Sequence, residues 1–164
     1  MVVSGGREVC GKLAGKIREV AGSIERDVRL MEVCGTHTQV VARYGIRSVL
    51  PSSVKLVSGP GCPVCVTAQR DIDCVVELAL SGVKVATYGD MMRVPGSRMS
   101  LGGARAEGAC VEVVCSVVDA LRMCKDGEDV VFFGVGFETT APMSAVALSK
   151  GLCVYSVHKT MPAA

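Results

Sequence analysis

The sequence predicts an α/β protein whose mostly parallel sheet is covered by helices. Short apolar runs alternate with longer stretches of helical periodicity, and this alternation is typical of βαβ units. Glycine and proline gather directly after several of the apolar runs, where strands would end. Hydrophobic residues make up 49% of the chain and aromatic residues only 4%. The core is therefore expected to consist mainly of Val, Leu, Ala, Met and Cys side chains.

The periodicity assigns each stretch of the chain to a strand or a helix. Strands are expected at residues 29–33, 55–58, 83–88, 129–135 and 153–157. Helices are expected at residues 8–21, 38–44, 66–81, 105–124 and 141–150, with a weak point in the fourth near residues 111–115.

A polar turn at residues 125–128 (KDGE) precedes a new strand and suggests a domain boundary. We expect a first α/β lobe over residues 1–127 and the start of a second, similar lobe over residues 128–164. The chain ends soon after its last predicted strand, without the helix that would normally cover it. The second lobe is therefore expected to be truncated.

Charge and hydropathy exclude several classes of function. The net charge is only +2, and no basic stripe is interleaved with aromatic residues, so we do not expect nucleic-acid binding. No stretch approaches the roughly 20 apolar residues of a membrane span. Charged residues such as Arg7, Lys12 and Lys16 interrupt any signal-peptide pattern near the N-terminus. We expect a cytoplasmic protein.

The chain contains nine cysteines, which is a high number for a cytosolic protein. In a reducing compartment, a CxxC pair indicates metal or redox chemistry before it indicates a structural disulfide. Six cysteines stand alone within helix or strand patterns and are expected to be small buried hydrophobes. These six are Cys10, Cys74, Cys110, Cys115, Cys124 and Cys153.

The strongest motif is GPGCPVC at residues 59–65, which follows a predicted strand and opens the predicted helix 66–81. The positive end of a helix favours thiolates, so Cys62 and Cys65 are expected to be good nucleophiles and metal ligands there. Pro63 stiffens the turn between them. A second loop, CGTHT, places Cys34 and His37 after the first strand.

Further polar residues follow other strands. The stretch GVGFETTAP at residues 134–142 lacks the third glycine of a dinucleotide fingerprint, so we interpret it as a rigid loop that presents Glu138, Thr139 and Thr140. Helix capping is the simpler role for Thr36, Thr38 and the two threonines of this loop. Residues 89–96 (GDMMRVPG) also follow a strand, and Asp90 and Arg93 there either contact a ligand or belong to a solvated loop.

Three kinds of site are compatible with these residues. Cys34, Cys62, Cys65 and His37 could form a structural Cys3His zinc site. Cys62 and Cys65 could instead cycle between dithiol and disulfide in a thiol-disulfide oxidoreductase. The three thiolates could also hold iron with positions left open for other ligands.

Five motifs together resemble the HypD family of hydrogenase formation proteins. They are MEVCGTHT (31–38), GPGCPVCVT (59–67), YGDMMRVPGS (88–97), ARAEGA (104–109) and VVFFGVGFETTAP (130–142), and they occur in order. The resemblance implies a hydrogenase maturation factor that works as a scaffold for assembly of the Fe(CN)2CO unit of NiFe hydrogenases. It implies partners of the HypC type, a small chaperone, and of the HypE type, which delivers cyanide. It implies an assembly scaffold with redox-active thiols rather than a stand-alone enzyme.

The same resemblance implies roles for individual residues. Cys34, Cys62 and Cys65 match the iron-site cysteines, with Cys34 and Cys65 as direct ligands and Cys62 as the redox or transfer thiol. His37 and Glu138 match catalytic residues of the same cleft. Thr36, Thr139 and Thr140 match residues that line it and contact the bound unit.

The chain departs from the family pattern in its length. Family members are about twice as long and continue through a second lobe to a region whose cysteines bind a 4Fe–4S cluster. None of the six scattered cysteines here has a suitable cluster spacing. The resemblance therefore implies iron in transit at the three cysteines and no cluster ligands in this chain.

Overall fold

The structure is a computed structural model that describes residues 4–161. The chain divides into two compact units, an N-terminal unit that ends at Gly61 and a C-terminal unit that begins at Cys62. The boundary predicted after residue 127 does not coincide with this division. Strands on both sides of residue 127 belong to one sheet, and residues 125–128 connect a helix to the next strand of that sheet.

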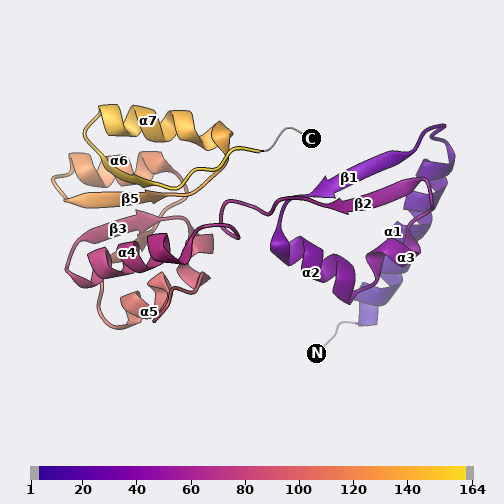
Figure 1. Ribbon diagram of the computed structural model, residues 1–164, viewed down its shortest axis with the longest axis horizontal. Helices are drawn as coiled ribbons and strands as arrows, with labels where there is room; N and C mark the ends of the chain where they lie inside the picture. Colours follow the sequence, from indigo (N-terminus) through magenta and orange to yellow (C-terminus); the bar gives the residue numbers. More distant parts are fainter. Residues whose placement is uncertain (1–3, 162–164) are drawn as a thin grey trace. The chain divides into compact units, whose positions relative to one another are not determined.

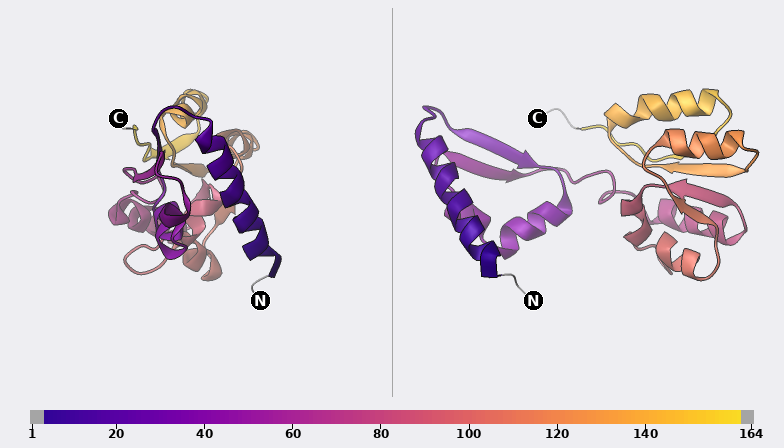
Figure 2. Two further views of the ribbon diagram at one scale, coloured as in Figure 1. Left: turned by 90° about the vertical axis from the view of Figure 1, so that its right-hand side faces the viewer. Right: turned by 180° about the vertical axis from the view of Figure 1, so that it is seen from behind.

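The N-terminal unit is a two-stranded parallel sheet with three helices. Its elements are α1 (Ser4–Gly22), β1 (Val28–Glu32), α2 (Gly35–Arg43), α3 (Ile46–Val49) and β2 (Val54–Ser58). The two strands pair in register from Val28 opposite Val54 to Glu32 opposite Ser58. The helices lie on one side of the paired strands (Figures 1 and 2). Ala21 and Val41 are the described hydrophobic side chains of this unit that are buried.

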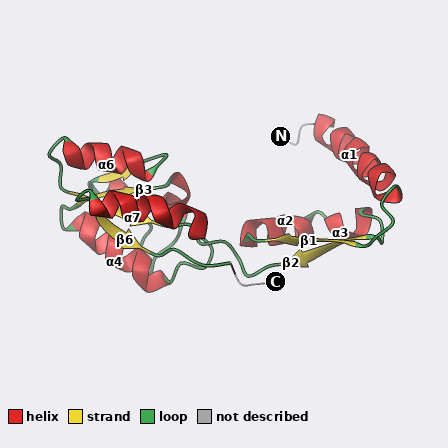
Figure 3. Cartoon of the chain, turned by 90° about the horizontal axis from the view of Figure 1, so that it is seen from above, coloured by secondary structure: helices red, strands yellow, loops and turns green. Residues whose placement is uncertain are grey.

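The C-terminal unit is a four-stranded parallel sheet with helices on both faces. Its helices and 3₁₀ helices are α4 (Gln69–Leu80), η1 (Gly89–Arg93), α5 (Leu101–Ala106), α6 (Val117–Lys125), η2 (Glu138–Thr140) and α7 (Ala141–Ser149). Its strands are β3 (Lys84–Thr87), β4 (Val111–Val113), β5 (Val130–Gly134) and β6 (Cys153–Ser156). The strand order is β4-β3-β5-β6, and each neighbouring pair is parallel. Figures 1 and 3 show the helices of this unit around its strands.

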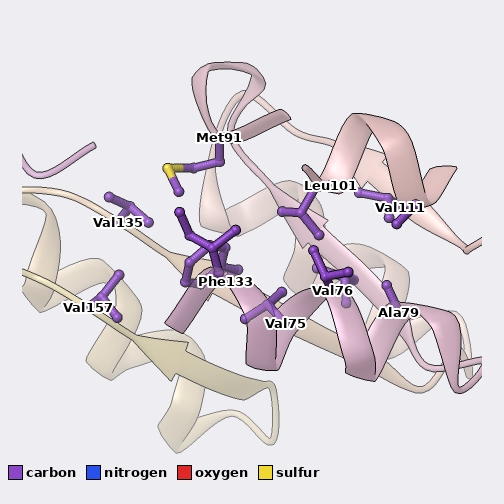
Figure 4. Packing of buried hydrophobic residues seen from close by; sticks show 12 residues of the cluster. Val75, Val76, Ala79, Met91, Leu101, Val111, Phe133, Val135 and Val157 are labelled. Atoms are coloured by element: carbon purple, nitrogen blue, oxygen red, sulfur yellow. The ribbon is translucent and has the colours of Figure 1, made fainter. Parts of the chain in front are cut away.

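Each face of this sheet has its own apolar cluster. One cluster joins α4 and α5 to the sheet, and there Val75, Leu101 and Phe133 have no exposed surface (Figure 4). The other joins α6 and α7 to the opposite face through Ala120, Phe132 and neighbouring side chains. Successive residues of a strand point to opposite faces, so the adjacent Phe132 and Phe133 contribute to different clusters. The α/β fold with covered parallel sheets is as the sequence predicts.

Four of the five predicted helices match observed ones, and all five predicted strands are present within about two residues at each end. The helix predicted over residues 105–124 is wrong. The chain instead forms α5, β4 and α6 there. Gly108, at φ 98°, follows the end of α5. Ser116 starts α6 with a capping box to Asp119.

The prediction that the six scattered cysteines are buried is also wrong. Cys10, Cys74, Cys115 and Cys153 are exposed, and Cys110 and Cys124 are half-buried. On α4, the neighbouring Val75 and Val76 are buried, whereas Cys74 is exposed. Cys110 and Cys115 lie in the loops on either side of β4.

Candidate thiol and metal site

The carboxyl ends of β1 and β2 bring the CGTHT loop next to the GPG turn. The Gly59 amide donates a hydrogen bond to the Glu32 carbonyl oxygen at 2.8 Å, which extends the pairing one residue beyond the strands. A Cβ atom at position 59 would lie 2.6 Å from that oxygen, so only glycine fits. Within the N-terminal unit, Cys34 therefore lies two residues after a backbone contact that joins the ends of β1 and β2.

Glu32 organises the loop that carries Cys34. Its carboxylate accepts hydrogen bonds from the Thr38 hydroxyl and, at 3.3 Å, from the Cys34 amide. The bond from Thr38 is the main reason that the pKa of Glu32 lies below its usual value, and the Cys34 amide lowers it further. The capping role predicted for Thr38 is wrong. Cys34 occupies the N-cap position of α2, and the Thr38 hydroxyl bonds Glu32 instead.

Cys62 and Cys65 form a close thiol pair at the start of the C-terminal unit. Their sulfur atoms lie 2.8 Å apart. The Cys65 amide donates to the Cys62 sulfur at 3.3 Å, and the Val66 amide donates to the Cys62 carbonyl oxygen at 3.0 Å. The Thr67 hydroxyl closes the turn on the Pro63 carbonyl oxygen at 2.7 Å. The CxxC spacing therefore produces one isolated helical turn that holds both thiols on one side.

The sequence suggested that the thiol pair lies at the N-terminus of a helix. This prediction is wrong. Helix α4 begins at Gln69 with Ala68 as its N-cap, four residues after Cys65. The effect of a helix dipole fades beyond the first turn, so α4 is not the source of thiolate stabilisation. The Cys65 amide takes that role locally, because it points at the Cys62 sulfur and favours negative charge there.

A shallow pocket of about 430 Å³ opens beside Cys65 within the C-terminal unit. One wall is the thiol turn and the start of α4, and the other is the η1 loop after β3. Its lining residues are Val64, Cys65, Thr67, Gln69, Ile72, Asp90, Arg93, Val94 and Pro95. The carboxyl ends of parallel strands are the usual ligand side of such a sheet.

The loop predicted to present Glu138, Thr139 and Thr140 forms η2, between β5 and α7. The Glu138 carboxylate accepts a hydrogen bond from the Met161 amide at 2.6 Å, and the Thr140 hydroxyl donates to the Phe137 carbonyl oxygen at 2.9 Å. The Thr140 side chain therefore supports its own loop, whereas Glu138 joins η2 to the segment after β6. His37 and Thr36 are exposed in the first turn of α2, in the N-terminal unit.

Two polar groups near the ends of strands were missed by the sequence reasoning. His158 follows β6, bonds the Ser156 hydroxyl through Nδ1 at 2.8 Å, and has a pKa lowered by burial. Tyr155 bonds the Asp71 carboxylate at 3.2 Å, and burial first, with Asp71 second, raises its pKa to about 12. The placement of His158 directly after an apolar run was the signal that could have identified it.

Comparisons with known proteins match this chain over nearly its whole length. The family model described as "HypD: Hydrogenase formation hypA family" covers residues 8–164. The chain belongs to the HypD family. It is 46% identical to the hydrogenase maturation factor HypD of Azotobacter vinelandii, over 93% of this chain and 43% of that protein. It is 47% identical to the HypD of Escherichia coli strain K12, over 77% of this chain and 35% of that protein.

A third relative gives a similar match. A putative hydrogenase expression/formation protein of Methanocaldococcus jannaschii is 44% identical, over 87% of this chain and 40% of that protein. The chain thus spans about two fifths of the length of the HypD relatives that it matches. Among residues 4–161, no helix is both long and apolar enough to cross a membrane.

Proposed function

We propose that this chain is the thiol-bearing part of a hydrogenase maturation factor and that it holds iron while the Fe(CN)2CO unit is assembled. The observation that carries the proposal is the Cys62–Cys65 pair, whose sulfurs lie 2.8 Å apart on a turn at the end of a strand, in a member of the HypD family. Thiolates are soft ligands, and they suit low-spin iron that carries cyanide and carbon monoxide. Iron is the cargo here rather than a resident cofactor.

Cys34 and Cys65 are proposed as the iron ligands, with Cys62 as the redox or transfer thiol. The bond between Gly59 and Glu32 supports this set, because it fixes the strand ends from which the Cys34 loop and the thiol turn depart. The amide aimed at the Cys62 sulfur favours its thiolate, which is the form that attacks or transfers. His37, in the same loop as Cys34, is proposed to move protons at this site.

The remaining assignments extend the same proposal. Thr36, Thr139 and Thr140 contact the bound unit through their hydroxyls, and Glu138 contributes a carboxylate. The hydrogen bond from Met161 supports a fixed orientation for Glu138 more than a mobile proton-carrying role. A HypC-type chaperone and a HypE-type cyanide donor are the proposed partners, and the cytoplasm is the proposed compartment.

The test is anaerobic co-purification of the chain with HypC- and HypE-type partners, followed by infrared spectroscopy and metal analysis. Cyanide and carbonyl stretches are expected with the unchanged chain. Cys34→Ser and Cys65→Ser are expected to lower iron to background and abolish both bands. Cys62→Ser is expected to retain iron but to lose the bands. Cys153→Ser is the matched control, because Cys153 is exposed on β6, and it should change neither result.

Stoichiometric zinc with no cyanide or carbonyl bands would overturn the iron proposal in favour of the structural Cys3His zinc site. The second candidate, a thiol-disulfide oxidoreductase, is favoured by the short distance between the two sulfurs, which need little movement to reach the roughly 2.05 Å of a disulfide. It predicts a reversible Cys62–Cys65 disulfide that forms equally well in metal-free Cys34→Ser.

A further inference from the structure

The pocket beside Cys65 contains two charged side chains that the proposed function does not use. Asp90 and Arg93 both belong to η1, and both line the pocket. Apolar side chains form much of the remaining wall: Val64, Ile72, Val94 and Pro95. A pocket with an apolar lining and a few convergent polar groups is the usual form of a small-molecule site.

The wall that carries Arg93 is fixed at both ends. Met91, in the middle of η1, has no exposed surface and packs in the apolar cluster near Phe133 (Figure 4). At the other end, the Asp73 carboxylate accepts hydrogen bonds from the amide and the hydroxyl of Ser97, each at 2.6 Å. Asp73 belongs to α4, the helix that also supplies Ile72 to the pocket. The two walls are therefore held together before any ligand arrives.

We call the two hydrogen bonds between Asp73 and Ser97 the Asp73–Ser97 clamp. The adjacent Gly96 allows its loop to approach α4 closely enough for these bonds to form. A Cβ atom at Gly96 would lie 2.5 Å from an Asp73 carboxylate oxygen and 2.7 Å from the Met99 carbonyl oxygen. Both contacts are shorter than side chains tolerate, so a larger residue would push the loop away from α4. The shape of the pocket thus depends on the Asp73–Ser97 clamp and on Gly96.

Arg93 is available to a ligand. Within residues 4–161, its guanidinium makes no ion pair or hydrogen bond, and neither does the Asp90 carboxylate. Guanidinium groups bind carboxylate and phosphate oxygens in pairs, whereas carboxylates accept from N–H and O–H donors. We propose that the pocket binds a small anionic ligand, with its anionic group on Arg93, its N–H or O–H donor on Asp90, and its reactive end toward Cys65.

This inference goes beyond the proposed function, because it concerns selection of a ligand by charge and requires no particular metal. It predicts that an anionic reagent reaches Cys65 faster, relative to a neutral one, than it reaches a thiol outside the pocket. Iodoacetate and iodoacetamide are suitable probes, since they have nearly the same size and differ in charge. Each forms a bond between carbon and the Cys65 sulfur and releases iodide.

The experiment measures both alkylation rates at Cys65 in the reduced, metal-free chain of residues 1–164 by peptide mass spectrometry. The ratio of the iodoacetate rate to the iodoacetamide rate is used, because both reagents need the thiolate and its population cancels. Arg93→Gln is expected to lower this ratio about threefold, on the order of the effect of one partly screened charge. Asp90→Asn is expected to raise it. The exposed Cys153 provides an internal reference in the same digest.

Two control variants keep the proposal falsifiable. Arg93→Lys retains the positive charge and should keep the ratio within about twofold of the unchanged chain. Arg98→Gln removes an arginine that lines a different pocket, and it should leave the ratio unchanged. An unchanged ratio in Arg93→Gln, or an equal fall in Arg98→Gln, would overturn the anion site. That outcome would not contradict iron binding, which is measured separately by metal analysis and infrared spectroscopy. Failure of this inference is therefore distinguishable from failure of the proposed function.

Discussion

The two units of the chain bury their apolar side chains to very different extents. In the C-terminal unit, Phe132 and Phe133 have no exposed surface. In the N-terminal unit, Leu30 and Met31 on β1 remain 52% and 47% exposed. Burial of apolar surface contributes roughly 25 cal/mol per Å². The C-terminal unit is therefore stabilised by its own core, whereas the N-terminal unit gains little from one.

This difference matters for the candidate site because its parts are held in place by different forces. The loop that carries Cys34 is held by backbone and side-chain hydrogen bonds around Glu32 and Gly59. The pocket beside Cys65 is held by the buried Met91 and by the Asp73–Ser97 clamp on a packed helix. Core substitutions should thus affect the C-terminal unit, and hydrogen-bond or glycine substitutions should affect the Cys34 loop.

The largest expected effect is that of a core truncation in the C-terminal unit. Phe133→Ala removes a fully buried ring and should lower the free energy of unfolding of that unit by about 3–5 kcal/mol. The matched substitution in the other unit, Leu30→Ala, should change stability by no more than about 0.5 kcal/mol, because Leu30 is half exposed. Hydrogen exchange of the full chain, resolved by peptide, measures both units at once. Equal effects of the two substitutions would contradict the contrast between the units.

The contrast between the units could not be predicted from the sequence, although most elements could. Apolar runs such as that of β5 marked the strands, because a buried parallel strand needs apolar residues on both faces. Which strands share a sheet depends on pairing between distant residues, such as Val85 with Val131, and no local pattern specifies it. The turn at residues 125–128 suggested a domain boundary. In the structure it connects α6 to β5 within the C-terminal unit.

At the candidate site, the spacing of the cysteines predicted correctly which thiols lie together, but the residues around them did not predict where the next helix begins. The CxxC spacing correctly indicated that Cys62 and Cys65 lie together. The start of the following helix was predicted too early, because Val66 continues the apolar pattern while Thr67 bonds back to Pro63 and closes the turn. β4 was missed since only three residues form it, with a charged Glu112 at its centre. The pairing of Asp73 with Ser97 joins residues far apart in sequence and had no signal.

A smaller effect is expected at the strand ends of the N-terminal unit. Gly59→Ala places a Cβ atom 2.6 Å from the Glu32 carbonyl oxygen, so the backbone must shift and the last β1–β2 hydrogen bond must weaken. We expect a loss of about 1–3 kcal/mol in the local stability of this unit. Hydrogen exchange at the Gly59 amide measures it directly. Gly22→Ala, where nothing lies within 4 Å of the added atom, is the control and should be neutral or slightly stabilising. If the amide of residue 59 is as well protected in Gly59→Ala as in the unchanged chain, the strand end tolerates a side chain.

The smallest expected effect is that of acid on the hydrogen bonds between Asp73 and Ser97. The hydroxyl and then the amide of Ser97 lower the pKa of Asp73 below its ordinary value of 3.8. A carboxyl group with a depressed pKa in the folded state stabilises that state fully above its unfolded value. This contribution is lost as the pH falls through the lower, folded value. The loop at residues 89–97 should therefore be firmly held at pH 6 and should loosen below about pH 4. Asp73→Asn lacks the ionised carboxylate, so its loop should already be looser at pH 6 and should respond less to acid. Hydrogen exchange at the Ser97 amide, corrected for the intrinsic pH dependence of exchange, compares the acid response of Asp73→Asn with that of the unchanged chain. The same acid response in both would mean that another group controls the loop, and that the clamp does not shape the pocket beside Cys65.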